Sequence, residues 1–409
     1  MTEFPIDHVR ASFPALRDGF IFFDNAAGAQ APETVLNAVA DHLLHRNVQR
    51  GGRYKQSLEV DRVIAQARES VGTLVNARFP EEISFGMNAT SFMRLISLAI
   101  GQSLGDRREV IVTDLDHEAN IAVWLALERE GAKILWWHFR PDGRLHPEDL
   151  EKLLSRRTRV VACTLASNAI GSILDIAEVS RRAHAVGAEV FVDAVHFGPH
   201  GPIDVQEFEC DYLVCSGYKI FSPHMGFLWG RLEKLNALPT FREDFVPDTS
   251  PAKLEIGTYI YENVAGMDAA VRYLEDLGRL IAPETTSRRA ALVVCTEAIR
   301  RYEAQLSLAM LDVLANAKAD VYGITALDGI SHRTPTLCFN LPAVPAAKVT
   351  EGLARQNIAV RDGHMYSPRL MKRLGLSREH GAVRASLVHY NTLEEVEKFG
   401  RALSGIRSA

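Results

Sequence analysis

The chain has 409 residues, is 47% hydrophobic and carries a formal net charge of −5 at pH 7. This length exceeds what one ordinary domain holds, so we expect two domains, and the scattered Lys and Arg residues argue against a nucleic-acid surface, which needs a concentrated basic face. No apolar run approaches a membrane span, the N-terminus lacks a signal pattern, and the five cysteines form no CxxC pair, which together indicate a cytoplasmic protein with reduced thiols.

Short apolar runs alternate with helical patterns in the middle of the chain. The apolar runs cover residues 81–87, 108–114, 132–139, 158–167, 188–195 and 211–217, and helical patterns over 91–104, 119–131 and 177–187 lie between them. Runs that are apolar on both faces, separated by helices, predict a mainly parallel sheet that is covered on both sides. The run 225–230 follows after only a short turn, which predicts an antiparallel return strand.

The pattern changes from Glu262 onward. Residues 262–278 and 285–311 predict long helices, residues 334–341 and 382–390 predict strands, and a last helix is expected after Asn391. We therefore predict an α/β fold with a large domain over residues 16–262, which carries the mainly parallel sheet. A smaller α+β domain is predicted from residues 1–15 and 263–409.

Polar residues follow five of the predicted strands. Ligands of an open parallel sheet bind at the carboxyl ends of its strands, so these residues are candidates for one site. They are Asn88, Ala89 and Thr90; Asp116, His117 and Glu118; Ser167 and Asn168; Asp193 and His196; and Ser216, Tyr218 and Lys219.

Lys219 and Asp193 suggest the chemistry of this site. A lysine directly after an apolar run is exposed, is paired, or has a lowered pKa that frees its amine for reaction. Asp193 is either a helix cap or the partner of a cation, such as the protonated pyridine nitrogen of pyridoxal phosphate (PLP). In the second case Lys219 would hold the PLP aldehyde as a Schiff base. Ala89 and Thr90 begin a predicted helix, whose free N–H groups are either locally capped or able to bind a phosphate.

Eight motifs occur together and carry a resemblance to a known family. They are FDNAAGAQAP (23–32), NAT (88–90), DHEANI (116–121), SNAIG (167–171), VDAVH (192–196), CSGYK (215–219), EIGT (255–258) and VRASLVHYNT (383–392). The chain resembles the cysteine desulfurase and selenocysteine lyase group of the class V aminotransferases over nearly its whole length. His196 stands where that family has Gln, and Tyr218 where it has His. The resemblance implies a PLP-dependent transferase of fold type I, with residues 16–262 as the PLP-binding domain.

The same resemblance implies roles around the cofactor. Lys219 forms the Schiff base and moves the Cα proton, while Asp193 holds the pyridinium and His117 stacks on the ring. Asn168 and His196 lie near the phenolic oxygen. The implied phosphate ligands are Ala89, Thr90, Ser216, Tyr218 and, from the other subunit of a homodimer, Thr258.

The resemblance also implies where the substrate binds. Arg384 would grip the substrate carboxylate as a bidentate fork, although by itself it also fits an outward residue of an alternating strand. Arg361 and Tyr366 are the other candidates for substrate binding. Desulfurases carry a persulfide-forming cysteine just beyond a GIAVR-like strand, and this chain has His364, Met365 and Tyr366 there instead. Because a phenol cannot store sulfane sulfur, a persulfide relay is not expected.

The sequence thus predicts a homodimeric PLP enzyme that acts on a small α-amino acid by desulfurase-like C–S or C–Se lyase chemistry without a persulfide cysteine. Aminotransferase or epimerase chemistry is the first alternative. A metallohydrolase is the second, using Asp114, Asp116, His117, His196 and His200, but it leaves Lys219 and the NAT motif unexplained. A catalytically silent protein of the same fold is the third. No resident metal is expected in the leading interpretation.

Overall fold

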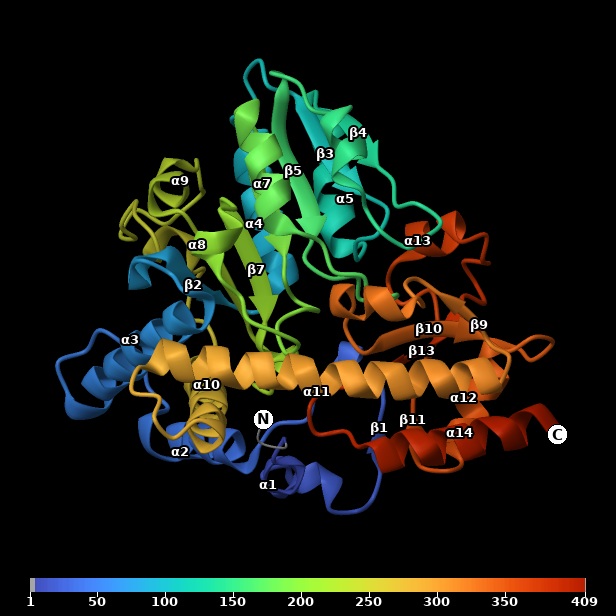
Figure 1. Cartoon of the computed structure of the whole chain (residues 1–409). Coiled ribbons are helices and arrows are strands. Elements are labelled where there is room, and N and C mark those ends of the chain that lie inside the picture. The colour runs from blue at the N-terminus through green and yellow to red at the C-terminus, as the bar shows by residue number, and fades with distance from the viewer. Residues whose placement is uncertain (1–3, 409) are drawn as a thin grey trace.

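The computed structural model describes residues 4–408 and forms an α/β fold with two main sheets (Figure 1). Residues 1–3 and 409, the ends of the predicted small domain, lie outside the described residues. Within residues 4–408, no helix is both long enough and apolar enough to cross a membrane.

The large sheet has seven strands in the order β2-β8-β7-β6-β5-β3-β4. Their bounds are β2 Ile83–Gly86, β8 Gly226–Gly230, β7 Tyr212–Ser216, β6 Glu189–Asp193, β5 Thr158–Thr164, β3 Glu109–Thr113 and β4 Lys133–Trp137. Only β8 runs antiparallel to its neighbours, so the predicted mainly parallel sheet and its return strand are confirmed. The carboxyl ends of the other strands therefore meet at one edge.

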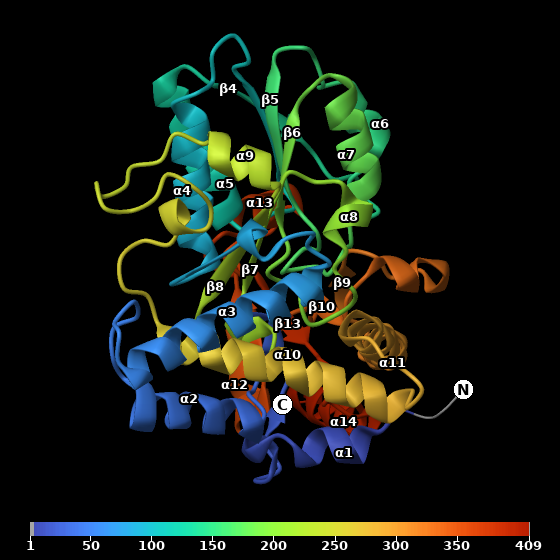
Figure 2. The same cartoon turned by 90° about the vertical axis from the view of Figure 1, so that its left-hand side faces the viewer.

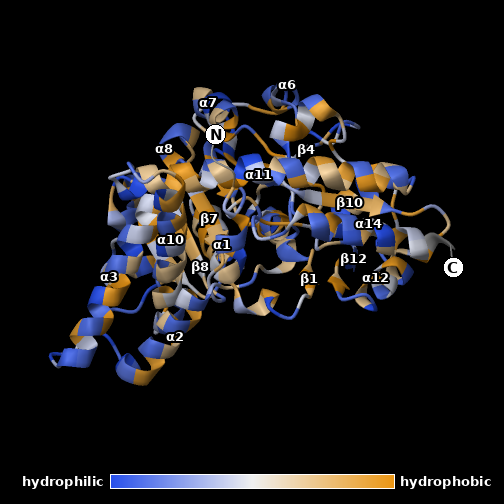
Figure 3. Cartoon of the chain, turned by 60° about the horizontal axis from the view of Figure 1, so that its bottom comes forward, coloured by the Kyte–Doolittle hydropathy of each residue, from blue (hydrophilic) through white to orange (hydrophobic). Residues whose placement is uncertain are grey.

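Helices cover both faces of this sheet, as Figure 2 shows. On one face lie α4 (Ala89–Gly101) and α5 (Ala119–Leu125), which pack on side chains such as Val112 and Val214. On the other lie α6 (Pro147–Glu151), α7 (Ile176–Ala185) and α8 (Val205–Phe208), with side chains such as Val161 and Leu213 in that core. Consecutive residues of one strand thus enter opposite cores, which is why the strands are apolar on both faces. Figure 3 shows β7 and β8 as apolar strands within a more polar surround.

Long helices join the two halves of the molecule. α10 (Tyr261–Ile281) packs against α11 (Arg288–Asn316), α2 (Glu33–Arg46) and α3 (Lys55–Val75). In Figure 1, α11 runs beneath the large sheet toward the C-terminal half. Ser287 caps α11, because its side chain accepts a hydrogen bond from the N–H of Ala290. Two further short helices are α1 (Ile6–Ala11) and α9 (Leu232–Ala237).

The smaller sheet is antiparallel, in the order β12-β13-β10-β9. Its strands are β12 Arg361–Gly363, β13 Ala382–Ser386, β10 Thr336–Asn340 and β9 Asp320–Tyr322, and helices α12 (Ala346–Ala354), α13 (Pro368–Arg373) and α14 (Leu393–Ser408) accompany it. A separate parallel pair joins β1 (Ile21–Phe22) to β11 (Ile358–Ala359). This pair places the segment after β1 beside β13. The domain boundaries at residues 15 and 262 stay a prediction.

Two predicted elements end earlier than the sequence pattern suggests. The helix expected over 119–131 is α-helical only to Leu125 and continues as a 3₁₀ turn, Ala126–Glu130, before Gly131 takes a left-handed conformation. The strand expected over 382–390 ends at Ser386. The chain turns there because Asn391 is held by Asn25, whose Nδ2 donates to the Asn391 Oδ1 at 3.1 Å.

Candidate active site

Lys219 is buried at the carboxyl end of the large sheet, so its reading as an exposed lysine is wrong. It ends the 3₁₀ turn Gly217–Lys219 directly after β7, and only 6% of it is exposed. Burial and, to a smaller extent, the nearby Arg384 guanidinium lower its pKa to about 8, while Asp193 opposes both. A buried amine with a lowered pKa is available as a nucleophile and base.

Asp193 is the last residue of β6, the strand next to β7. Burial raises its pKa to about 6, while the Val195 N–H, which donates to its Oδ1 at 2.9 Å, and the Lys219 ammonium lower it. It does not cap a helix: its hydrogen bond closes a local turn. A second cation beside Asp193 would stabilise its charge in this buried position.

His117 lies at the start of α5 and contacts Tyr366 from the far end of the chain. Its Nδ1 accepts from the Ala119 N–H at 3.0 Å, and burial, with Lys219 and Arg384, lowers its pKa to about 4. A neutral imidazole is therefore its stable form at neutral pH. The Tyr366 ring stacks against it with centroids 5.7 Å apart.

The start of α4 forms a site that fits a phosphate. Ser216 at the end of β7 pairs with Gly226, which also pairs with Gly86. A Cβ on Gly226 would lie only 2.6 Å from the amide nitrogen of Ala89, so glycine lets the strand approach the helix start. Asn88 caps α4, because its Oδ1 accepts a hydrogen bond from the Ser91 N–H. Local capping was the predicted alternative to phosphate binding at this helix start. That cap leaves the first N–H groups of the helix without intrahelical acceptors.

Tyr218 directly precedes Lys219 and contacts both His224 and the N-terminal segment. Its ring stacks on His224 with centroids 4.9 Å apart, and its carbonyl accepts from the Ala29 N–H at 3.1 Å. Lys219 Nζ lies 5.8 Å from the Tyr218 ring centroid. Burial raises the pKa of the Tyr218 phenol, and Asp193 adds to this. Tyr218 therefore stays a neutral donor near the site.

Asn168 ties the large sheet to the loop that carries Tyr366. Its Nδ2 donates to the Met365 carbonyl at 2.7 Å, its Oδ1 accepts from the Ser367 hydroxyl at 3.0 Å, and its own carbonyl accepts from Arg384. The Tyr366 carbonyl accepts from the Glu118 N–H at 2.8 Å. Met365 and Tyr366 both have positive φ angles. Three anchors thus hold this loop in a conformation that non-glycine residues rarely adopt.

His196 is buried after β6, with its Nε2 at 3.0 Å from the Thr336 hydroxyl and 3.3 Å from that of Thr334. Its ring lies 5.1 Å from the ring of His200, which pairs with Glu303 at 2.8 Å. Burial, followed by His200, Lys219 and Arg384, holds the pKa of His196 well below its usual range. His196 is therefore neutral and can serve as a hydrogen-bonding group.

Arg384 is the most deeply buried cation of the site. It lies in the middle of β13, opposite Arg361 of β12, and is 1% exposed. Its Nη1 donates to the Asn168 carbonyl at 2.9 Å and its Nη2 to Asp24 at 3.0 Å. Burial lowers its pKa, which Asp24 opposes. Arg384 thus points inward, and its reading as an outward strand residue is wrong.

Thr258 is the predicted site residue that lies apart from the others. It is exposed, and its hydroxyl donates to the Gln49 Oε1 at 3.3 Å. Within residues 4–408, Thr258 makes no hydrogen bond with Lys219 or Asp193. Its predicted role requires a second subunit and is considered below.

The residues of the metallohydrolase alternative have other partners. Asp114 binds the His138 ring, Asp116 accepts from Thr113 and Asn120, and His200 pairs with Glu303. In the described part of the chain, no group of three or more His, Cys, Asp or Glu side chains is arranged to hold a metal ion. The geometry therefore gives that alternative no support.

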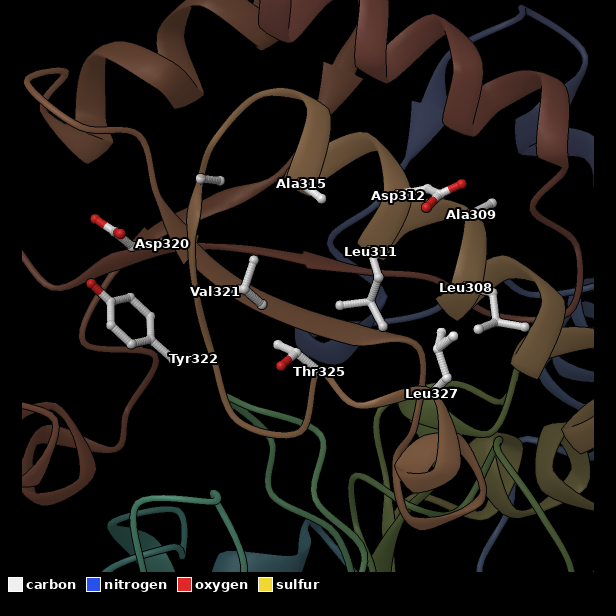
Figure 4. Close-up of a pocket in the computed structure, with 11 residues that line it drawn as sticks. Leu308, Ala309, Leu311, Asp312, Ala315, Asp320, Val321, Tyr322, Thr325 and Leu327 are labelled. Atoms are coloured by element: carbon white, nitrogen blue, oxygen red, sulfur yellow. The ribbon is translucent and has the colours of Figure 1, made fainter.

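Figure 4 shows a groove elsewhere in the molecule, with a volume of about 900 Å³. It lies between the end of α11, β9 and the segment that follows β9. Its lining residues include Leu311, Val321 and Leu327 but no Lys, Arg or His. The groove therefore lacks the groups needed for Schiff-base or phosphate chemistry.

A family model described as Aminotransferase class-V matches residues 21–399. The chain belongs to the class-V aminotransferase family. It is 34% identical to Aminotransferase-like protein FGM3 of Gibberella zeae over 98% of both chains. It is 31% identical to a cysteine desulfurase of Pectobacterium atrosepticum, with 99% of this chain and 98% of that one covered.

Solved structures of class-V relatives have the same fold. The apo cysteine desulfurase from Thermococcus onnurineus NA1 matches with a TM-score of 0.88 at 26% identity, and all of both chains is covered. The cysteine desulfurase CsdA from Escherichia coli matches with a TM-score of 0.85 at 27% identity over 100% of this chain and 99% of that one. The predicted fold type I and family resemblance are confirmed.

Class-V aminotransferases and cysteine desulfurases are PLP-dependent, so this chain is a PLP-dependent enzyme. Its site fits that cofactor. Lys219 offers a buried amine with a lowered pKa, Asp193 offers a carboxylate at the end of β6, the strand beside β7, and α4 offers free N–H groups. These groups match the aldehyde, the pyridine nitrogen and the phosphate of PLP.

The sequence analysis missed two residues at this class-V site. Asp24 was quoted only as part of a motif, yet it contacts both Arg361 and Arg384. His224 stacks on Tyr218. Asp24 directly follows the apolar residues 20–23, so the rule that polar residues after strands mark the site could have found it. His224 carries no comparable signal.

Proposed function

We propose that this enzyme cleaves the C–S or C–Se bond of a small α-amino acid by elimination at Cβ and releases the sulfur or selenium as a free small molecule. The proposal rests on the similarity to cysteine desulfurases over the whole chain. The observation that carries its distinctive part is the anchored loop Gly363–Ser367, in which Tyr366 faces His117.

PLP supplies an electron sink that stabilises negative charge at Cα of a bound amino acid. Lys219 Nζ is the base for the Cα proton, since burial and Arg384 lower its pKa and part of it is neutral near pH 7. Asp193 would bind the pyridine nitrogen of PLP and orient the ring. Neutral His117 would cover the face of that ring. The N–H groups at the start of α4, with Ser216, hold the phosphate.

Arg384 orients the substrate through its carboxylate. Its guanidinium is held by the Asn168 carbonyl and faces Lys219 closely enough to lower the pKa of that amine. A fixed fork restricts the rotation of a bound carboxylate and directs the Cα proton toward Lys219. Because Lys219, Asn168 and Arg384 are all buried, water is excluded from the reacting atoms.

Sulfur transfer to the protein is not part of this proposal. All five cysteines are buried and free: Cys163, Cys210, Cys215, Cys295 and Cys338. Burial raises the pKa of each thiol, to about 12 for Cys215 and Cys338. A buried thiol of high pKa is a poor nucleophile. Five free thiols also support our proposal of a cytoplasmic location.

Transamination is a second candidate, favoured by the 34% identity to Aminotransferase-like protein FGM3. The same base, ring partner and carboxylate fork serve both reactions, because both begin with removal of the Cα proton. Elimination would then expel sulfur from Cβ, whereas transamination would return the proton to the aldehyde carbon of the cofactor. The neutral His117 and Lys219 are the groups placed to return it. The two candidates differ in their products.

Incubation with L-cysteine alone is expected to yield sulfide, pyruvate and ammonia in equal amounts, with water consumed and no reductant needed. The elimination leaves no saturated product, so alanine should be absent. Formation of 3-mercaptopyruvate without sulfide, together with the amino acid that corresponds to an added keto acid, would instead establish transamination. Chromatography of the amino and keto acids, together with a sulfide assay, distinguishes these outcomes.

The same incubation provides the control for sulfur storage. Intact-mass measurement after exposure to cysteine should show no added sulfur on the chain. A persulfide mapped by digestion to any of the five cysteines would contradict the proposed route, since a thiol would then have accepted the sulfur.

We also propose that the active unit is a homodimer. Several large apolar side chains are exposed: Leu44 at 76%, Tyr54 at 50%, Met87 at 55% and Ile256 at 68%. Met87 immediately precedes the NAT segment, and Ile256 lies two residues before Thr258. Large apolar side chains that a partner covers mark interaction surfaces, and a partner over Ile256 would bring Thr258 to the phosphate of the other subunit.

Sedimentation of the PLP-loaded protein at assay concentration is expected to show a dimer. Ile256→Asp should shift it to monomer and reduce PLP affinity, because the buried charge opposes association and removes the partner's Thr258. Leu327→Asp, at an exposed leucine beside the groove of Figure 4, is the matched control and should stay dimeric. A fully active monomeric native protein would contradict the proposal.

A further inference from the structure

Asp24 lies between two arginines that face each other across strands. Arg361 and Arg384 are direct partners in the β12–β13 pair. Asp24 accepts from Arg384 Nη2 at 3.0 Å, while Arg361 approaches it with Nε at 3.0 Å and Nη2 at 2.8 Å. Like charges on directly paired strand residues repel each other, so the Asp24 carboxylate offsets this repulsion.

The free part of Arg384 shows what else could bind there. Nε and Nη2 share one edge of a guanidinium, and a carboxylate can bind both at once. In Arg384, Asp24 takes Nη2, and Nε is fully buried without a hydrogen-bond partner among the described residues. Nη1 is already bound to the Asn168 carbonyl. A substrate carboxylate that binds the Nε–Nη2 edge therefore meets the Asp24 carboxylate at Nη2 and competes with it for this nitrogen.

We propose that Asp24 is an internal carboxylate that competes with the substrate for Arg384. When a substrate carboxylate binds, Asp24 leaves Arg384 and keeps its contacts with Arg361. Asp24 is thus a specificity-determining residue that does not touch the reacting atoms. This inference rests on the proposed function, in which Arg384 binds the substrate carboxylate.

The local charges give this competition a consequence for substrate choice. The two guanidiniums and one carboxylate leave a net charge of one positive unit. The other titratable groups near Arg384 include His117 and His196, which are neutral because burial lowers their pKa values, and Tyr218 and Cys338, which are neutral because burial raises theirs. The Lys219 amine also lies near Arg384. The arginine pair therefore accommodates one further negative charge. We infer that substrates with one carboxylate are favoured over dicarboxylates.

The test uses the PLP-loaded protein and unreactive carboxylates, so that it does not depend on which reaction follows. Propionate and succinate are titrated by calorimetry into native protein and Asp24→Asn. The variant should bind propionate about tenfold more tightly, because a neutral amide competes less well for Nη2 than a charged carboxylate does. The gain should be larger for succinate, because the second negative charge is no longer opposed by Asp24.

Two variants make the result decisive. Asp320→Asn removes an exposed carboxylate from β9 and should leave both affinities unchanged. Arg361→Gln leaves Asp24 with Arg384 as its only arginine partner and should weaken propionate binding about tenfold. In the double variant with Asp24→Asn, the Arg361 substitution should cause no such weakening. If Asp24→Asn does not fold, the Arg361→Gln result alone decides, and unchanged binding there overturns the inference.

Arg384→Lys separates this inference from the proposed function. Loss of carboxylate binding in that variant, together with unchanged or weaker binding in a folded Asp24→Asn, would show that Asp24 only holds the arginines in place. Unchanged binding in Arg384→Lys would instead refute the carboxylate site itself. Visible absorption of each variant verifies that PLP is loaded.

Discussion

Replacing Lys219 with Ala is expected to abolish the covalent linkage to PLP and to lower kcat/KM by at least about 10³-fold, since general acid–base catalysis alone contributes 10²–10⁴-fold. The buried amine is both the group that bonds the aldehyde and the base for the Cα proton. PLP should still bind through the α4 N–H groups and Asp193, although more weakly. Borohydride reduction followed by peptide mapping measures the linkage directly.

The control for this substitution is Lys348→Ala, which removes an exposed lysine of α12. That variant should keep the reducible linkage, the activity and the melting temperature. A reducible linkage that persists in Lys219→Ala, at the same peptide or at another lysine, would show that Lys219 is not the cofactor lysine.

The pH dependence of PLP incorporation gives an independent check on Lys219. Burial lowers the pKa of this amine to about 8, so half of it is in the reactive neutral form at that pH, and this form can increase only about twofold above it. The rate of linkage formation in the apo protein should follow this titration. An exposed lysine would continue to gain reactivity up to about pH 10.

The gathering of the site at the sheet edge could be predicted because parallel strands end together. Asp193 and Lys219 follow adjacent strands, β6 and β7, and the NAT segment follows β2 beyond β8. Local sequence alone identified each as a polar residue after an apolar run. In a parallel sheet, the carboxyl ends of the strands that precede these residues must lie at one edge.

Contacts between distant segments could not be predicted in this way. Asp24 reaches Arg384 because β1 pairs with β11 and an isolated bridge joins Asp24 to Ser386. That register depends on side-chain packing of the smaller core, where Phe23 and Val383 are fully buried. Periodicity shows which face of a strand is apolar but not which distant strand lies beside it.

The conformation of the Tyr366 loop was also beyond the sequence pattern. Met365 and Tyr366 both adopt positive φ angles, which residues other than glycine and asparagine seldom do. Hydrogen bonds from Asn168, Ser367 and Glu118 hold this conformation. Because Asn168 and Glu118 lie far from this loop in the sequence, only the folded structure shows that the loop is anchored.

Replacing Asp193 with Asn is expected to keep the Lys219 linkage but to lower kcat by about 10³-fold or more, since a positioned ion pair with the cofactor ring contributes several kcal/mol. The carboxylate is needed to keep the pyridine nitrogen protonated, and an amide of the same shape cannot do so. Without that positive charge, the ring is a poor electron sink for the charge that forms at Cα. The visible spectrum should show a bound cofactor, while single-turnover rates with cysteine measure the loss.

Asp116→Asn is the matched control for this prediction. Asp116 also lies at the edge of the same sheet and is 1% exposed, but burial raises its pKa to about 8, so it is largely protonated at neutral pH. Its replacement by Asn therefore removes little charge, and kcat should stay within about tenfold of native. Equal losses in the two variants would attribute the Asp193 effect to general disruption of the sheet edge. A large loss confined to Asp193→Asn, with the borohydride-reducible linkage intact, isolates the charge on Asp193 as the cause, because that residue and not Asp116 is ionised beside a cation.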